Sequence, residues 1–376
     1  MTAQTTTAGP TTSADRITNL DAVRGIAVLG ILLMNGVAFG LGTGPYYNLD
    51  TGGSSTPLDW AIGGFGEIFV DQKFMALFSM LFGAGIVLFA DRAEAKGLRA
   101  GRLSLWRNFL LFVIGIVHST IWIGDVLVLY AVCAPVLILV RRRPPAQLFA
   151  LGGLILLISP IAAVVAQGEV EVATDLAGYW TADDSTTGLV DAFMITDAVA
   201  RALSMMLIGV ALHRTGVITG QRSRTFYRRL TAIGLGVGLP LATLGFAIMA
   251  ASDFDVDVAL VGTIPNTLGT VPVALGYLGL ITLWNQRGET ARHRRVHAVG
   301  RMALTNYLSQ TVIGVLVLDL ALDSVDMTRT IVLAVIIAIW ALQLWWSQAW
   351  LERYRYGPAE WAWRCATYRR TTPLRR

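Results

Sequence analysis

The chain has 376 residues, of which 54% are apolar and only 15% are charged. Soluble domains carry about 25% charged residues, so this composition excludes a disordered protein, a collagen-like chain and a disulfide scaffold, and it disfavours a water-soluble globule. The net charge of +5 results from 30 Lys and Arg against 25 Asp and Glu. Because the basic residues stand in short clusters between long apolar runs, they indicate membrane-flanking charges rather than a nucleic-acid-binding surface. We expect no nucleic-acid partner.

Ten apolar stretches are candidates for helices that cross the hydrocarbon core, which takes about 17–25 residues. A further apolar stretch, 60–70, precedes the second of them, but Glu67, Asp71 and Lys73 indicate that it is interfacial or broken. We therefore predict an all-α polytopic membrane protein with about ten transmembrane helices. The predicted spans are 20–41, 74–90, 103–123, 126–140, 147–166, 195–212, 230–250, 258–283, 298–318 and 330–350.

The connections between these spans alternate in charge. Positively charged connections stay in the cytoplasm, so we predict that both termini are cytoplasmic and that the acidic connections are external. The basic connections are 91–107, 141–143, 214–229 and 287–301, and the acidic ones are 167–195 and 251–257.

The same pattern divides the chain into three parts. Residues 1–15 are rich in Thr, Ala and Gln and are predicted to be a disordered tail, because they lack the charged start of a signal peptide. Residues 16–350 form the transmembrane domain. Residues 351–376 form a basic cytoplasmic segment.

The third predicted span carries a candidate catalytic pair. Arg107 and His118 are 11 residues apart, about three helical turns, so they share one face about 16 Å apart. Asp125 follows Gly124 after a short turn and is predicted to lie beside His118 near the outer surface. Imidazole next to a carboxylate suits general base catalysis. The alternative is a hydrogen-bonded core histidine. Cys133 and Cys365 lack partners at metal-ligand spacing, and we expect no metal site.

Polar residues also enter the first and ninth spans. Asp21 and Arg24 are spaced for an i,i+3 ion pair, and Asn35 falls within the same sector of the first helix. Such a pair can simply anchor the helix end, and Asn35 can equally bind a neighbouring helix.

The inner half of the ninth span is unusually polar. Arg301, Thr305 and Ser309 are predicted to form one stripe, with Asn306 and Gln310 on the adjoining one. Buried donors at this density need partners, which a bound polar ligand or neighbouring helices would supply.

Several of these segments together resemble a known family. The chain resembles the YeiB-like proteins of the DUF418 family, and the match extends over about residues 16–368. That family looks related to membrane acyltransferases, which include the lysosomal heparan-α-glucosaminide N-acetyltransferase and the acyltransferase-3 proteins. The segments that carry the resemblance are 20–35, 73–85, 118–131, 300–308 and 356–364.

The resemblance implies acyl transfer across a bacterial cell membrane, from cytoplasmic acyl-CoA, acetyl-CoA in the simplest case, to a hydroxyl or amine on an outer small-molecule or glycan acceptor. The lysosomal enzyme is thought to use a histidine after its first helix, whereas residues 42–60 contain none here. His118 would then be the base, oriented by Asp125. The residues expected to hold the donor are Arg24, Arg107 and Arg301 at its phosphates and Asn35, Asn306 and Gln310 along its channel.

Two other classes of function fit the same residues. The intramembrane charges would also serve a transporter or flippase of a small anionic or amphipathic molecule. In a non-catalytic membrane scaffold they would all be structural. Acyl-CoA binding separates the first hypothesis from the other two, and homo-oligomerisation stays open.

Overall fold

The computed structural model describes residues 17–182, 185–322 and 324–376, so the tail predicted at 1–15 lies outside the described residues. Within the described ranges the chain is a bundle of helices, and its β-contact is an isolated bridge between Tyr354 and Arg375. Nine helical segments there are long and apolar enough to cross a membrane, and the shorter apolar helix α6 adds a tenth. The predicted all-α, multi-pass membrane protein is confirmed.

The helices follow the predicted spans closely. Their bounds are α1 (Thr18–Leu41), α2 (Thr43–Tyr47), α3 (Pro57–Phe65), α4 (Lys73–Ala95), α5 (Ala100–Ser119), α6 (Leu127–Val140), α7 (Pro145–Leu156), α8 (Ile158–Gln167), α9 (Gly188–Arg214), α10 (Arg224–Ala251), α11 (Ile264–Asn285), α12 (Ala291–Arg301), α13 (Ala303–Gly314), α14 (Arg329–Arg353) and α15 (Pro358–Tyr368). Two π-helical segments, η2 (Gly66–Val70) and η7 (Val315–Ala321), extend α3 and α13.

Hydroxyl side chains set the start of several spans. The hydroxyls of Thr187, Ser223 and Thr328 accept hydrogen bonds from backbone N–H groups in the first turns of α9, α10 and α14. These caps satisfy donors that the helix leaves unpaired at its start. The boundaries of these three spans therefore follow from local sequence.

Glycines let α4 and α9 approach closely. A Cβ added to Gly83 would stand 2.2 Å from the carbonyl oxygen of Met206, and one on Gly209 would stand 2.0 Å from that of Met80. Small residues of this kind allow helix backbones to pack tightly in a membrane. α9 also contacts α6, α7 and α8, which makes it a central element of this side of the bundle.

The second span is broken, as its charges indicated. Gln72 adopts a left-handed conformation with φ of 62° between η2 and α4. The break frees backbone carbonyl groups: that of Glu67 accepts from Lys73 Nζ at 2.7 Å, and that of Phe69 accepts from the hydroxyl of Tyr277 at 2.7 Å. Non-helical backbone at membrane depth needs such partners.

The ninth predicted span requires a correction. The helix breaks at Met302 (φ −110°, ψ 31°), so Arg301 ends α12 whereas Thr305 and Ser309 belong to α13. These three residues therefore do not form one continuous stripe. The fifth span is likewise divided at Leu157, between α7 and α8.

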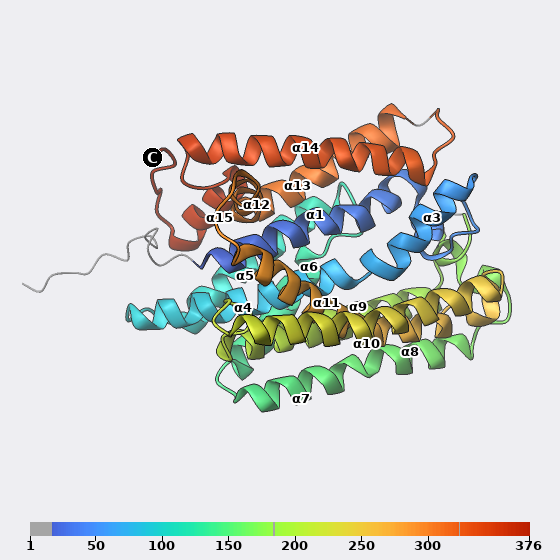
Figure 1. Ribbon diagram of the computed structural model, residues 1–376, viewed down its shortest axis with the longest axis horizontal. Coiled ribbons are helices and arrows are strands. Elements are labelled where there is room, and N and C mark those ends of the chain that lie inside the picture. Colours follow the sequence, from blue (N-terminus) through green and yellow to red (C-terminus); the bar gives the residue numbers. More distant parts are fainter. Residues whose placement is uncertain (1–16, 183–184, 323) are drawn as a thin grey trace, which may run out of the picture.

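The long helices run alongside one another, with α14 at one edge and α7 and α8 at the other (Figure 1). The start of α1 and the C-terminus lie at one end of the bundle, and α3 lies at the opposite end (Figure 1). The C-terminal segment folds back, because α15 packs against α5 and α13. The bundle therefore has two distinct ends, and a cavity lies toward each of them.

Candidate functional site

The first cavity has a volume of about 710 Å³ and is lined by α1, α4, α5, α6, α12, α13 and α15. We call it the basic cavity, because its charged lining residues are six cations and one carboxylate. Arg24, Arg107 and Arg301, which the sequence grouped as phosphate contacts, all lie on this wall. The remaining charged lining residues are Arg92, Lys96, Arg364 and Glu360.

The arginines of the basic cavity are held in different ways. The guanidinium of Arg107 lies between two aromatic rings, 4.5 Å from the centre of Phe89 and 4.0 Å from that of Trp363. Arg24 pairs with Asp21 at 3.6 Å, as the i,i+3 spacing predicted. Arg301 donates to the carbonyl of Arg355 at 3.3 Å. Arg107 is thus fixed by cation–π contacts, which constrain its position on the wall.

Glu360 organises the mouth of the basic cavity. Its carboxylate accepts hydrogen bonds from the backbone N–H groups of Leu304 (2.7 Å) and Thr305 (3.1 Å) and from the Thr305 hydroxyl (2.6 Å). A carboxylate at this place caps the start of α13. Burial raises the pKa of Glu360 above its usual value, although these hydrogen bonds act in the opposite direction. The C-terminal helix α15 is therefore part of the site.

The predicted pairing of His118 with Asp125 is confirmed. The His118 Nδ1 lies 2.7 Å from Asp125 Oδ1, and the two side chains are 3% and 0% exposed. Asp125 Oδ2 accepts from the backbone N–H of Val128 at 3.0 Å, and Oδ1 accepts from the hydroxyl of Tyr307 at 3.3 Å. His118 Nε2 is buried without a hydrogen-bond partner among the described residues.

This pair lies between two cavities. Tyr307 lines the basic cavity, whereas Asp125 lines a second cavity of about 830 Å³. The imidazole of His118 itself is not part of either lining. The Tyr307–Asp125 hydrogen bond therefore joins the two walls, and His118 supports it from within the protein.

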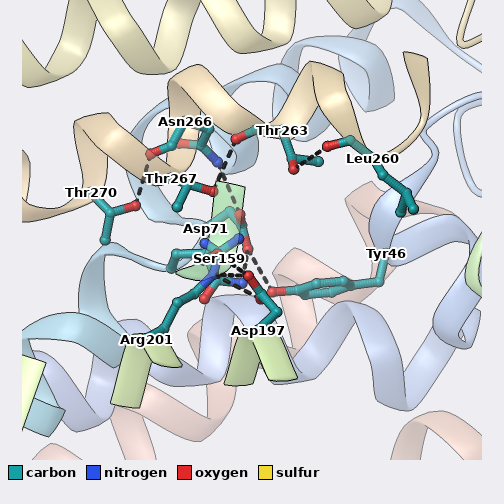
Figure 2. Close-up of polar contacts among 11 residues, drawn as sticks. Tyr46, Asp71, Ser159, Asp197, Arg201, Leu260, Thr263, Asn266, Thr267 and Thr270 are labelled. Carbon is teal, nitrogen blue, oxygen red and sulfur yellow. Dashed lines mark hydrogen bonds and ion pairs between the residues drawn. The ribbon is translucent and has the colours of Figure 1, made fainter. Parts of the chain in front are cut away.

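We call the second cavity the acidic cavity, because its charged lining residues are five carboxylates and one arginine. Figure 2 shows the polar contacts on one side of it, where Tyr46, Asp71 and Asn266 converge near Asp197 and Arg201. The cavity lies toward the end of the bundle where α2, α3 and the acidic connections are found. Its charged lining residues are Glu67, Asp71, Asp125, Asp197, Asp319 and Arg201.

The three amides expected along the donor channel lie elsewhere. Asn35 lines the acidic cavity, away from the arginines. Asn306 is fully buried and bonds to Ser347 Oγ (3.0 Å) and the indole N–H of Trp346 (2.7 Å). Gln310 donates to the carbonyl of Val28 (3.2 Å) and to Gln343 (2.9 Å). Asn306 and Gln310 thus stabilise packing of α13 against α14 and α1, the helix–helix role considered as the alternative.

Four site residues received no role from the sequence: Glu67, Arg201, Tyr307 and Glu360. A signal existed for Arg201, since it stands four residues after Asp197 inside an apolar run, the spacing of a helical ion pair. Tyr307 carried no comparable signal, because a tyrosine in a membrane helix is common and its partner Asp125 is distant in sequence.

The fold and its two cavities define a multi-pass helical membrane protein with a buried His–Asp pair. Residues 212–370 match the family described as protein of unknown function (DUF418). The chain is 33% identical to the uncharacterized protein YeiB of Escherichia coli (strain K12), over 96% of this chain and 98% of the relative. It is 28% identical to the uncharacterized protein YxaH of Bacillus subtilis (strain 168), over 97% of each. The chain therefore belongs to the YeiB-like DUF418 family.

Proposed function

We propose that the protein is an integral membrane acyltransferase. It moves an acyl group, acetyl in the simplest case, from acyl-CoA in the basic cavity to a hydroxyl or amine acceptor in the acidic cavity. One observation carries this proposal: cavities of opposite charge adjoin at the Tyr307–Asp125 hydrogen bond, and a buried histidine supports that bond.

The basic cavity suits a donor with a charged end and an apolar arm. Guanidinium groups bind phosphate oxygens through charge-assisted hydrogen bonds, and Arg24 and Arg301 stand near the surface end of the cavity. Its lining also includes the apolar side chains of Phe78, Phe82 and Leu111, together with Tyr307. A pantetheine arm lying along this wall would bring its thioester toward Tyr307 and Asp125.

The His118–Asp125 pair takes up the proton that the nucleophile loses. The hydroxyl or amine of the second substrate attacks the thioester carbonyl carbon, the carbon–sulfur bond breaks, and CoA leaves as the thiolate. Asp125 meets the acceptor, since it is the member of the pair on the cavity wall, and His118 shares the proton through the 2.7 Å contact. This extends the expectation that His118 alone is the base, oriented by Asp125. The Tyr307 hydroxyl donates its one proton to Asp125 and so holds that carboxylate in place beside the thioester.

The arrangement in the cell follows from the charges at the two ends. We place the protein in the bacterial cell membrane with both termini and the basic cavity on the cytoplasmic side, where acyl-CoA is found. The Arg-rich connections at that end support this orientation. The acidic cavity then opens outward to the acceptor.

A transporter or flippase is the second candidate. Two cavities separated by a closed centre, together with the break at Gln72, are also features of alternating-access proteins. Such a protein needs no cleavage of a thioester, so chemistry separates the two candidates.

The test uses the purified full-length protein with labelled acetyl-CoA. Equilibrium dialysis should show saturable binding, and CoA thiol should be released when amines or alcohols are added. Labelled acetyl must appear in the acceptor. Absence of acetyl-CoA binding would overturn the proposal, as would substrate counterflow in proteoliposomes without thiol release.

A further inference from the structure

The carboxylates of the acidic cavity differ in how fully they are occupied. Asp71 is saturated: its Oδ1 accepts from the hydroxyl of Tyr46 at 2.6 Å and from Gln72 Nε2 at 3.3 Å, and its Oδ2 accepts from Asn266 Nδ2 at 3.1 Å (Figure 2). Asp125 is held by His118, Tyr307 and a backbone N–H. Asp71 therefore has little capacity left to hold a ligand ammonium group, whereas Asp125 Oδ2 accepts one hydrogen bond and keeps one acceptor position.

Glu67 is different. Its carboxylate lines the cavity and makes no hydrogen bond or ion pair with a residue that the structure describes. Two cations that interact electrostatically with it use their hydrogen bonds elsewhere. Lys73 donates to the Glu67 backbone carbonyl and to Asn266, and Arg329 donates to the carbonyl of Pro45 at 2.7 Å. A carboxylate without a hydrogen bond or ion pair at a membrane-buried cavity is rare, and it is a candidate contact for a ligand.

Arg201 provides a second, independent indication of a ligand. Its side chain is 10% exposed and lines the same cavity, and its Nε is paired with Asp197 at 2.8 Å (Figure 2). The two terminal nitrogens have no hydrogen-bond partner among the described residues. A buried guanidinium in this state lacks acceptors, which oxygen atoms of a bound molecule would provide.

The wall around these groups is aromatic. Tyr47 and Tyr179 stack with ring centres 4.1 Å apart, and Tyr46, Trp122 and Phe254 also line the cavity. The faces of aromatic rings carry partial negative charge, so they attract cations and repel anions. Five lining carboxylates against one arginine favour the same sign of ligand charge.

We infer that the acidic cavity binds a small molecule bearing a cationic amine, which Glu67 and the aromatic wall recognise, together with hydroxyl or carboxylate oxygens, which Arg201 recognises. This inference rests on the proposed function and names the class of its acceptor. The ammonium gives one proton to the Asp125–His118 pair, and its nitrogen then forms a bond to the acyl carbon as the carbon–sulfur bond breaks. The second proton lost by the nitrogen goes to the CoA thiolate. The amide product is uncharged at that nitrogen and is released from the acidic wall.

The experiment measures binding without acetyl-CoA, so that it does not depend on transfer. Three matched pairs of probes differ by an amine in place of a hydroxyl: ethanolamine and ethylene glycol, tyramine and tyrosol, glucosamine and glucose. Calorimetry on the purified protein should show at least one amine bound more tightly than its neutral partner. Glu67→Gln should weaken that amine by about ten- to a hundredfold, the range for a lost charge-assisted contact, and should leave the neutral partner unchanged.

Glu169→Gln is the matched control, because Glu169 is an exposed glutamate that does not line the cavity, and it should retain amine binding. No preference for any amine in the parent protein would overturn the inference, and so would a preference that survives Glu67→Gln. If amines bind through Glu67 but acetyl is never transferred, the binding site stands and the acyltransferase proposal fails. If acetyl is transferred only to hydroxyl acceptors, the acyltransferase proposal stands and the inference of an amine acceptor fails.

Discussion

The basic and acidic cavities share α1, α4 and α6 but are otherwise built from different helices. The cations of the basic cavity stand within about two turns of a helix end or on the returning C-terminal segment, and the Arg24 side chain is still 32% exposed. The acidic cavity draws its charges from the helix break at 66–72 and from inside α9, where Asp197 and Arg201 are 18% and 10% exposed. Charge at a helix end stays near water and costs little, whereas charge inside the membrane must be paired or used.

This difference explains why the two cavities have different side-chain networks. In the basic cavity, Arg107 is fixed mainly by aromatic rings, which leaves its hydrogen-bonding capacity available. In the acidic cavity, Asp71 and Asp197 are almost fully engaged by protein groups. Among the groups below the surface, Glu67 and the end of Arg201 are not engaged by hydrogen bonds from the described residues, and they are then the informative ones.

The largest expected effect concerns which side of the membrane each cavity faces. In a Cys365→Ser background, Glu169→Cys and Arg224→Cys place exposed thiols at opposite ends of the bundle. An impermeant maleimide applied to intact cells should label the first completely and the second only after permeabilisation, because the proposed orientation puts the acidic connections outside and the basic ones in the cytoplasm. Labelling in the reverse pattern would exchange the two cavities and exclude cytoplasmic acyl-CoA from the basic one.

The next largest effect is expected where the cavities adjoin. His118→Ala and Asp125→Asn should each lower the rate of acetyl transfer by about 10²–10⁴-fold, the range for a lost general base, while acetyl-CoA binding is retained. Ser119→Ala is the control, because Ser119 bonds only to the carbonyl of Gly115 within α5. Thermal unfolding is recorded for each variant. A stable His118→Ala protein with full activity would make His118 a structural residue.

The sequence was sufficient to predict the spans and this pair. Apolar length and alternating charge located all ten spans, and the turn at Gly124 placed Asp125 beside His118 because only seven residues separate them. The same reasoning grouped Arg24, Arg107 and Arg301, since basic residues gather at one end of the bundle. Each of these inferences needed only the spacing of residues along the chain or the tendency of basic residues to gather on one side of the membrane.

The remaining site residues depend on contacts between distant segments. Asn306 and Gln310 look alike as channel-lining or packing residues until their neighbours on α14 and α1 are known. The break at Met302 was missed because residues 298–318 are continuously compatible with a helix. The Glu67 position was recognised only as a disturbance of the second span, since the meeting of its segment with Arg201 is a property of the tertiary structure.

A smaller effect should distinguish the basic cavity from the acidic one. Arg301→Ala should weaken acetyl-CoA binding by about 2 kcal/mol, roughly 30-fold, as expected for loss of a charge-assisted contact. Amine binding in the acidic cavity should not change. Arg287→Ala removes an exposed arginine outside the cavity and serves as the control. Equal acetyl-CoA affinity in the parent and Arg301→Ala proteins would show that the donor does not use this wall.

The smallest effect is a pH dependence at the mouth of the basic cavity. Burial raises the pKa of Glu360, so the folded protein holds the proton more tightly than the unfolded chain does. The contribution of Glu360 to stability is therefore complete below the ordinary carboxyl pKa of about 4.3 and is lost as the pH rises through the higher folded-state value. Glu360→Gln cannot ionise and keeps an acceptor for the N–H groups of Leu304 and Thr305. Its unfolding temperature should fall less than that of the parent as the pH is raised. Glu352→Gln, at an exposed position, should behave like the parent. If the unfolding temperatures of the parent and Glu360→Gln changed in parallel with pH, the pKa of Glu360 would not be raised. The hydrogen bonds at the start of α13 would then outweigh the effect of burial on that pKa.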